Sequence, residues 1–195
     1  MPFLPPADAT EAELQTTFEK EIAFWGYLPN YARVFAHRPE VLNGFRTLQG
    51  AIRSGFDPRL YELATLAASR TLTSTYCSLA HAKALVDRFY SKEDVLRIVT
   101  TPEESALTPG EVLLMEFAAK VARDATSVQP ADVEALSKSG FTPVEIFGIA
   151  ATAAARSFFA KLLDALGAEP DAALTGLGPE LVAELTVGRP IAAGG

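Results

Sequence analysis

One cysteine and one histidine, four residues apart, are the side chains of this sequence best suited to do chemistry. Cys77 is the only cysteine of the 195-residue chain, and His81 is one of only two histidines. In a helix, residues four apart lie on one face, one turn from each other. A histidine in that position favours the thiolate, which is the reactive form of cysteine. The pair therefore indicates a candidate nucleophile with a basic partner.

The residues before this pair predict a helix that begins beside the cysteine. The stretch 71–75, Thr-Leu-Thr-Ser-Thr, is rich in hydroxyl and β-branched residues, which are poor inside a helix and good at its N-cap. With Thr73 or Ser74 as the N-cap, Cys77 comes near the third or fourth position of the helix. Unpaired backbone N–H groups and the positive end of the helix dipole lie there, and both favour a thiolate.

A carboxylate from the preceding helix completes the candidate site. Glu62 lies in a helix expected over residues 58–70. If the two helices pack antiparallel across the break at 71–73, Glu62 can reach His81 or Cys77. A carboxylate in that place orients the imidazole and accepts or relays a proton.

Each of these residues also has a structural interpretation. Ser74 serves first as an N-cap, although its hydroxyl can hydrogen-bond a thiolate or a peroxide oxygen. Tyr76 packs in the core, although its hydroxyl can donate into a pocket. A lone cysteine in an alanine-rich helix is commonly a small buried hydrophobe. One cysteine and one histidine without a second pair make an incomplete zinc site, so we expect no metal and no cofactor.

Helices separated by short breaks account for the rest of the chain. We expect an all-α fold of about eight or nine helices, because capping boxes, prolines at helix starts and glycines at helix ends recur along the sequence. No run alternates strictly between apolar and polar residues, so strands are not expected. The expected helical segments are 10–25, 30–37, 39–55, 58–70, 74–89, 91–100, 108–124, 130–140 and 143–166, and residues 179–186 can form one more.

The order of these segments predicts one helical domain with an extension at each end. The domain covers residues 10–170, an extended arm covers 1–9, and a C-terminal extension covers 171–195. The last residues, from Gly188 on, have no clear packing face and are expected to be loose.

The expected helix over 143–166 is apolar nearly all round, which predicts burial on most sides. A second subunit would make such burial easier in a domain of this size, so we expect a homo-oligomer. Arg156 and Lys161 are charges on this apolar helix. Paired or snorkelling side chains are the default for such residues, and binding of an anionic substrate is the alternative.

The net charge, the N-terminal residues and the length of the apolar runs indicate which partners and which compartment to expect. The chain has 17 basic and 24 acidic residues and a net charge of -7, which gives no electrostatic footprint for nucleic acid. The N-terminus lacks the features of a signal peptide. The most apolar run, 146–155, is too short to span a membrane, which takes about 20 residues. We therefore expect a cytoplasmic protein without nucleic-acid or membrane partners.

The spacing of the candidate site residues resembles the signature of a known family. Glu62, Ser74, Cys77 and His81 form Glu-x11-Ser-x2-Cys-x3-His. This is similar to the Glu-x11-Cys-x2-Cys-x3-His of the alkylhydroperoxidase branch of the AhpD-like, or carboxymuconolactone decarboxylase, superfamily. Ser74 stands at the position of the first cysteine, and Tyr76 stands just before the second. Three further parts resemble the family: 27–30 with 38–42, 136–146, and 161–167.

The resemblance covers about residues 20–170, and its second half is most similar to the peroxidase-related branch. It implies an AhpD-like multi-helical fold that assembles as a dimer, trimer or hexamer. It also implies a thiol-dependent peroxidase site. In that chemistry the second cysteine attacks the peroxide and becomes a sulfenic acid, the first cysteine resolves it as a disulfide, and glutamate and histidine handle protons. By this resemblance Cys77 is the nucleophile, and His81 and Glu62 are the proton-handling residues.

The serine at position 74 is the main departure from the family pattern. Without a second cysteine, an intrachain resolving step is impossible, so we expect an antioxidant peroxidase that uses a small-molecule hydroperoxide and an external thiol reductant. Two alternatives stay open. One is a decarboxylase or lactone-type acid–base enzyme that uses His81 and Glu62, with Cys77 only lining the pocket. The other is a non-catalytic, redox-sensing helical oligomer.

Overall fold

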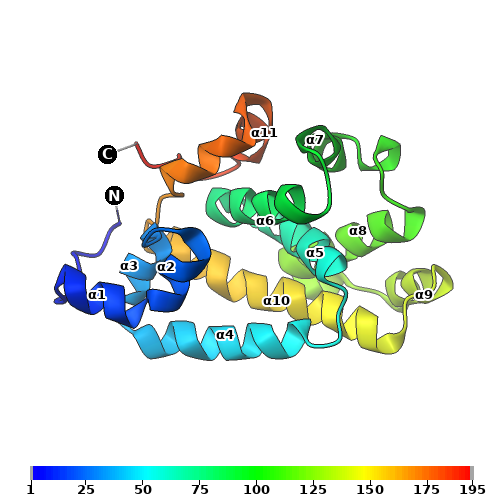
Figure 1. Cartoon of the computed structure of the whole chain (residues 1–195). Helices are drawn as coiled ribbons and strands as arrows, with labels where there is room; N and C mark the ends of the chain where they lie inside the picture. The colour runs from blue at the N-terminus through cyan, green and yellow to red at the C-terminus, as the bar shows by residue number, and fades with distance from the viewer. Residues whose placement is uncertain (1, 194–195) are drawn as a thin grey trace.

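Helices form all of the regular structure in the part of the chain that the computed structural model describes, residues 2–193 (Figure 1). The expected all-α class is confirmed. Eleven α-helices occur among these residues, because the first expected helix is divided in two and the short one near the C-terminus also forms. In chain order they are α1 (Glu11–Thr17), α2 (Glu19–Trp25), α3 (Asn30–Phe35), α4 (Pro39–Arg53), α5 (Pro58–Thr71), α6 (Thr75–Arg88), α7 (Lys92–Thr100), α8 (Pro109–Asp124), α9 (Pro130–Lys138), α10 (Pro143–Ala165) and α11 (Pro179–Leu185). Three short 3-10 helices complete the set: η1 (Pro102–Glu104), η2 (Ala125–Ser127) and η3 (Ala172–Leu177).

The helix starts follow the capping signals in the sequence. The side chains of Thr10, Thr108 and Thr142 each accept a hydrogen bond from the backbone N–H three residues on, and a glutamate at that position accepts one from the threonine backbone. These reciprocal bonds satisfy two donors that a helix start otherwise leaves unpaired. Local capping chemistry therefore fixes where α1, α8 and α10 begin.

The first expected helix is broken at Phe18, which ends α1 and begins α2. Phe18 has a non-helical backbone, with φ -114° and ψ 26°, and its side chain is buried in the core. The two threonines before it are weak helix formers. Burial of the aromatic ring therefore outweighs the continuity of the helix.

α5 is the central helix of the fold. It packs against α6, α8 and α10, and every residue from 61 to 69 is buried. Small and apolar side chains allow such enclosure. The hydroxyls of Thr65 and Ser69 donate to backbone oxygens one turn earlier, at 2.7 Å in both cases. Glu62 is thus carried on the most enclosed helix of the molecule.

α10 lies beside α5 and also packs against α4 and α8. Its inner side is buried, but its outer side exposes Val144, Phe147 and Phe158 by 75%, 74% and 46%. The expected burial on most sides is therefore not reached within a single chain. By length and hydropathy α10 is the one helix among residues 2–193 that would be able to cross a membrane, and half of its apolar window is buried inside the fold. The apolar run taken from the sequence, residues 146–155, was shorter than the apolar window of α10.

The C-terminal extension covers the start of α6, at the upper left of Figure 1. The backbone N–H of Gly188 donates to Oγ1 of Thr75 at 2.8 Å. A Cβ atom at Gly188 would collide with the carbonyl oxygen of Thr73, so this close crossing requires glycine. The guanidinium of Arg189 donates to the backbone oxygen of Asp164. The expected loose tail is therefore docked here, and its last two residues lie outside the described part of the chain.

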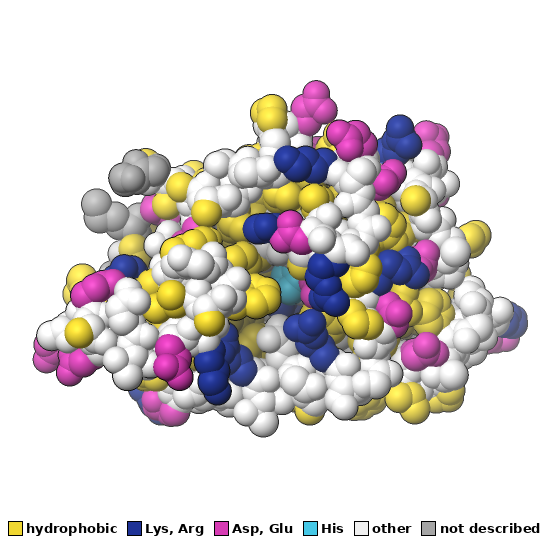
Figure 2. All heavy atoms as spheres, in the orientation of Figure 1, with side chains coloured by type: hydrophobic (Ala, Val, Ile, Leu, Met, Phe, Trp, Pro, Cys, Tyr) yellow, Lys and Arg dark blue, Asp and Glu magenta, His cyan; other side chains and the backbone are white. Residues whose placement is uncertain are grey.

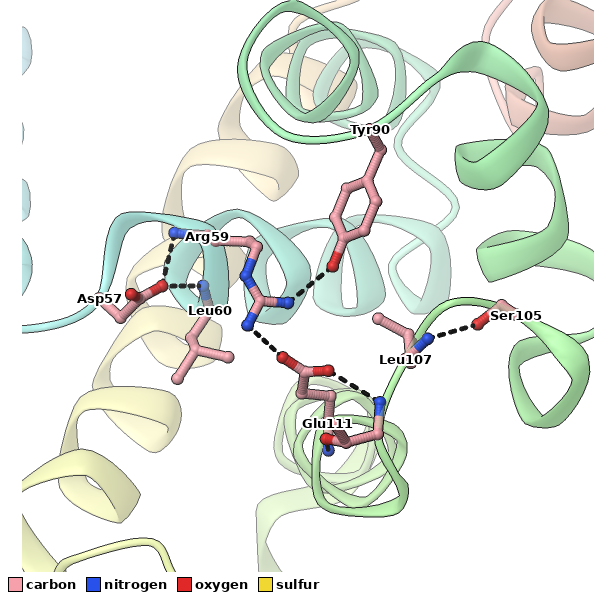
Figure 3. A network of polar contacts seen from close by, with 8 residues as sticks. Asp57, Arg59, Leu60, Tyr90, Ser105, Leu107 and Glu111 are labelled. Atoms are coloured by element: carbon pink, nitrogen blue, oxygen red, sulfur yellow. Dashed lines mark hydrogen bonds and ion pairs between the residues drawn. The ribbon is translucent and has the colours of Figure 1, made fainter.

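Arg59 links the starts of α5 and α8 to the end of α6 (Figure 3). One nitrogen of its guanidinium donates to the hydroxyl of Tyr90 at 2.7 Å, and another pairs with the carboxylate of Glu111. Glu111 also accepts the N–H of Thr108 at 2.8 Å as part of the capping box. Burial would raise the pKa of Glu111, but the Thr108 N–H and the Arg59 charge outweigh it and lower this pKa. One buried carboxylate thus serves both a helix cap and a tie between helices.

The double role of Glu111 predicts an unequal cost for two similar substitutions. Glu111→Ala should lower the free energy of unfolding by about 2 kcal/mol, because it removes a cap and leaves Arg59 without its buried partner. Glu145→Ala removes the cap of α10, where the carboxylate pairs with no cation within residues 2–193, and should cost about 1 kcal/mol. Urea denaturation of both variants tests this difference. Equal losses would show that the tie through Arg59 contributes nothing.

Candidate active site

The tight connection between α5 and α6 places the two helices side by side. Thr73 adopts a left-handed backbone with φ 54°, and Ser74 is the N-cap residue of α6. Cys77 is then the third residue of this helix, as expected. Backbone N–H groups without intrahelical partners lie in this first turn, together with the positive end of the helix dipole.

Ser74 starts α6 through its backbone and not through its side chain. Its carbonyl oxygen accepts the N–H of Ser78 at 3.0 Å, whereas its hydroxyl makes no capping bond. The side chain is fully buried, and its hydroxyl faces the Asp164 carboxyl: burial raises the pKa of Asp164, and Ser74 partly offsets this effect. The structure therefore places a closed, polar group at the position of the missing first cysteine.

Glu62 and His81 form the central hydrogen bond of the site. Nδ1 of His81 lies 2.6 Å from Oε2 of Glu62. Glu62 is 4% exposed, and the His81 side chain is 15% exposed. With its proton on Nδ1, the imidazole donates to the carboxylate and leaves Nε2 free to accept a proton. The antiparallel arrangement expected from the sequence thus produces an oriented acid–base pair.

The charges around this pair set its protonation. Burial would raise the pKa of Glu62, but the adjacent His81 and the more distant charges of Arg53 and Arg156 outweigh it, so the pKa is lowered. Burial is also the largest influence on His81 and lowers its pKa, and the charge of Arg156 adds to this effect against the pull of Glu62. An ionised carboxylate beside a neutral imidazole is the resulting state at neutral pH.

Cys77 is 2% exposed and lies beside Arg156 of α10. Nη1 of Arg156 is 3.5 Å from Sγ of Cys77, and Arg156 itself is 4% exposed. The sequence indicated that Arg156 is a charge on an apolar helix, but it did not predict the contact between Arg156 and Cys77. That anomaly was the available signal, because a buried arginine needs a partner.

Tyr61 connects the site to the molecular surface. Its ring meets the ring of His81 edge-on, with 6.4 Å between centroids, and its hydroxyl accepts a hydrogen bond from Gln49 at 2.8 Å. The guanidinium of Arg53 lies over the same ring, 4.9 Å from its centroid. Figure 2 shows a histidine side chain at the bottom of a hollow on this face, with Lys and Arg side chains beside it. His81, at 15% exposure, is more accessible than Glu62 and Cys77.

Tyr76 is adjacent in sequence to the cysteine, but its hydroxyl points to another network. It donates to the carboxylate of Asp171 and accepts the backbone N–H of Tyr31 at 3.4 Å. Asp171 also accepts the N–H of Asn30 at 2.9 Å. Burial raises the pKa of both Tyr76 and Asp171. The structure thus brings Glu62 and His81 into contact and places Cys77 one helical turn before His81 on α6. The hydroxyl of Tyr76 instead links α3, α6 and the C-terminal extension.

No group of three or more metal-binding side chains comes together among residues 2–193. The side chains of the site offer a buried thiol, an imidazole, a carboxylate and a guanidinium. These groups can move protons and can support a sulfur nucleophile.

Comparison with known proteins relates this site to a family. Residues 39–120 match the sequence model of the carboxymuconolactone decarboxylase family. The matched range contains the glutamate, the cysteine and the histidine of the site and ends before Arg156. None of the curated proteins compared with the chain matches it significantly.

Solved structures share the fold over nearly the whole chain. An alkylhydroperoxidase AhpD core, an uncharacterised peroxidase-related protein from Ralstonia eutropha JMP134, has a TM-score of 0.79 and 23% identity, over 91% of this chain and 97% of that one. A peroxidase-related protein from Silicibacter sp. TM1040 has a TM-score of 0.78 and 24% identity, over 90% and 94% of the two chains. The debrominase Bmp8, in complex with 2,3,4-tribromopyrrole, has a TM-score of 0.73 and 16% identity, over 88% and 93%. At these identities the likeness shows a common fold.

The lowered pKa of His81 predicts how stability depends on pH. In the window between its folded value and about 6.5, the unfolded chain binds one more proton than the folded chain. The free energy of unfolding should therefore fall as the pH drops from about 7 to 5. His81→Gln should remove up to about 1.4 kcal/mol per pH unit of this slope.

Urea denaturation at several pH values measures the slope, and His37→Gln, which replaces an exposed histidine, is the control. An unchanged slope in His81→Gln, or a matching change in His37→Gln, would contradict the assignment.

Proposed function

Because the chain belongs to the AhpD-like, or carboxymuconolactone decarboxylase, superfamily, we propose that it reduces hydroperoxides with Cys77 as the nucleophile. The observation that carries this proposal is the buried hydrogen bond between Glu62 and His81, one helical turn from the sulfur. It supplies an oriented base in the place where a thiol must lose its proton. The relatives described as peroxidase-related support the same class of reaction.

The proposed reaction has two stages. In the first, the thiolate of Cys77 attacks one oxygen of the hydroperoxide, the S–O bond forms and the O–O bond breaks. The leaving alkoxide takes the proton that His81 accepted from the thiol, so an alcohol departs and the sulfur becomes a sulfenic acid. In the second, an external thiol attacks the sulfenic sulfur and releases water, and a second thiol then regenerates Cys77 and leaves as a disulfide.

The buried serine at position 74 is the reason that the reductant must be external. Its hydroxyl cannot form a disulfide, and the chain has no other cysteine. A small thiol in a reducing compartment such as the cytoplasm meets this need. The approach that we propose for such a molecule is on the side of His81, whose side chain is 15% exposed.

One alternative has an observation in its favour. The pair formed by Glu62 and His81 is complete without the sulfur, as an acid–base enzyme of the decarboxylase or lactone type would need. The fold also accommodates other reactions, since one structural neighbour is a debrominase. A redox sensor, the other alternative, would form one sulfenic acid per chain and stop there.

A substitution series separates these functions. Cys77→Ser should abolish the thiol-dependent consumption of a small hydroperoxide, because it removes the nucleophile. His81→Gln should lower the rate by about 10²-fold to 10⁴-fold, the usual contribution of a general base. Ser74→Ala should retain activity, because its hydroxyl takes no part. The measurement is hydroperoxide loss with an added dithiol, with mass spectrometry to follow the oxidation of the cysteine.

Each function predicts a different outcome of this series. Hydroperoxide consumption that persists in Cys77→Ser would contradict the thiol mechanism. Acid–base activity that survives Cys77→Ser and is lost in His81→Gln points to the decarboxylase or lactone type. One sulfenic acid per chain without turnover points to a sensor.

We also propose that the protein is a homo-oligomer that uses the outer face of α10. Exposed and half-exposed apolar residues follow one another there at alternating spacings of three and four: Val144, Phe147, Ala151, Ala154 and Phe158. A groove of about 160 Å³ between α4 and α10 runs beside Phe147. Large exposed apolar surfaces of this kind mark protein interfaces.

The stripe on α10 is complementary to itself in an antiparallel crossing. Two alanines in its middle allow the helices to approach closely, and the two phenylalanines on either side then meet across the two-fold axis. The same crossing brings Lys161 of each copy towards the end that carries Glu145 in the other, so opposite charges meet at the rim.

A single charge placed in this stripe should separate the subunits. Phe147→Glu is expected to shift the mass measured by light scattering from an oligomer to a monomer, because it buries an unpaired carboxylate in the contact. Phe24→Glu is the matched control, since Phe24 is 76% exposed on α2. Dissociation by the control and not by Phe147→Glu would place the interface elsewhere.

A further inference from the structure

Arg156 is a buried cation without a carboxylate partner. It is 4% exposed, and none of the carboxylates of residues 2–193 lies within 4.0 Å of its guanidinium. Its Nε is buried and has no hydrogen-bond partner among these residues. An isolated charge in a protein interior is so costly that buried charges are normally paired. The position of Arg156 therefore needs a neutralising neighbour.

The sulfur of Cys77 is the group placed to neutralise it. Nη1 of Arg156 is directed at Sγ of Cys77 across 3.5 Å, and its Cζ lies 5.3 Å from the centre of the Phe159 ring. Burial acts to lower the pKa of Arg156, but Cys77 and Tyr61 outweigh it, so the pKa is raised. The guanidinium thus keeps its charge, and the thiol is the neighbour in contact that can become an anion.

The other charged or titratable groups around the pair do not replace the sulfur. On α5, Glu62 is already engaged with His81 of α6 at 2.6 Å, and the hydroxyl of Tyr61 also faces the guanidinium but accepts a hydrogen bond from Gln49. Arg53 of α4 adds a second positive charge that acts on Glu62 and His81, but its side chain is exposed to solvent, which screens that charge. The charge of Glu62 acts on Arg156 only from beyond ion-pair distance. Cys77 is therefore the group in direct contact with the guanidinium that can take a negative charge.

We propose that Arg156 is a catalytic residue that holds Cys77 as a thiolate through a buried guanidinium–thiolate ion pair. The inference rests on the proposed function for its role in turnover, but the ion pair itself exists without any substrate. In the attack on a hydroperoxide, the thiolate forms the S–O bond, the O–O bond breaks, and His81, neutral at rest, relays the proton of the attacked oxygen to the departing alkoxide oxygen. An alcohol leaves, and the sulfenate that remains takes up a proton from solvent and becomes a sulfenic acid. Arg156 therefore stabilises the thiolate before the attack, and His81 transfers the proton.

The test reads the thiolate directly by its ultraviolet absorbance in the intact protein. Because the chain has one cysteine, the difference between the wild type and Cys77→Ser isolates this absorbance at each pH. The wild type should show the thiolate at neutral pH, well below about 8.5, where a free thiol titrates. Arg156→Met should move the transition up by about one pH unit or more, and Arg156→Lys should move it less. Lys161→Met, on the exposed side of the same helix, should leave it unchanged.

Equal transitions in the wild type and Arg156→Met would overturn the inference, and so would a native wild type that titrates like the protein in urea. The urea comparison uses only the wild type, so it decides the matter even if Arg156→Met does not fold. Circular dichroism reports folding for each variant. A thiolate that depends on Arg156 in a protein without peroxide turnover would contradict the proposed function alone. Cys77-dependent turnover with equal transitions would contradict this inference alone.

Discussion

Charge neutralisation in the core between α5, α6 and α10 is the constraint on which the site depends. Glu62 and Arg156 are both almost fully buried, and neither tolerates that position without a partner. His81 meets the carboxylate and Cys77 meets the guanidinium. Two polar contacts of modest net stability thereby decide which side chains can occupy the centre of a largely apolar fold.

The rest of the molecule fixes the distance between these groups. α5 is enclosed on all sides, so its glutamate has little freedom to move, and the tight connection through Thr73 sets α6 beside it. α10 brings the guanidinium from the opposite side and closes the core. The network of Arg59 and Glu111 holds the start of α5 against α8 and the end of α6. Rigid packing thus replaces the loops that carry many other active sites.

Sequence spacing was sufficient for the parts of the site that are local. Cys77 and His81 are one turn apart by helical periodicity, and an antiparallel pair of helices was enough to predict the contact of Glu62 with His81. The contact with Arg156 spans 79 residues, and neither periodicity nor capping chemistry carries information over such a distance. The break at Phe18 and the direction of the Tyr76 hydroxyl likewise depend on burial, which a single sequence does not reveal.

The C-terminal tail around Gly188, which crosses the start of α6, limits the paths by which reactants can reach Cys77. Gly188 crosses the start of α6 at Thr73 and Thr75, and Ser74 beneath it is fully buried, so the side of the missing cysteine is closed to small molecules. In the reaction proposed above, a hydroperoxide and a thiol would both have to reach the sulfur past His81 and would share one path. They would then react in turn, and the oxidised protein would be a separate species that reacts with the thiol in a second step. The proposed reaction would therefore alternate between two forms of the protein and would not bind both reactants at once.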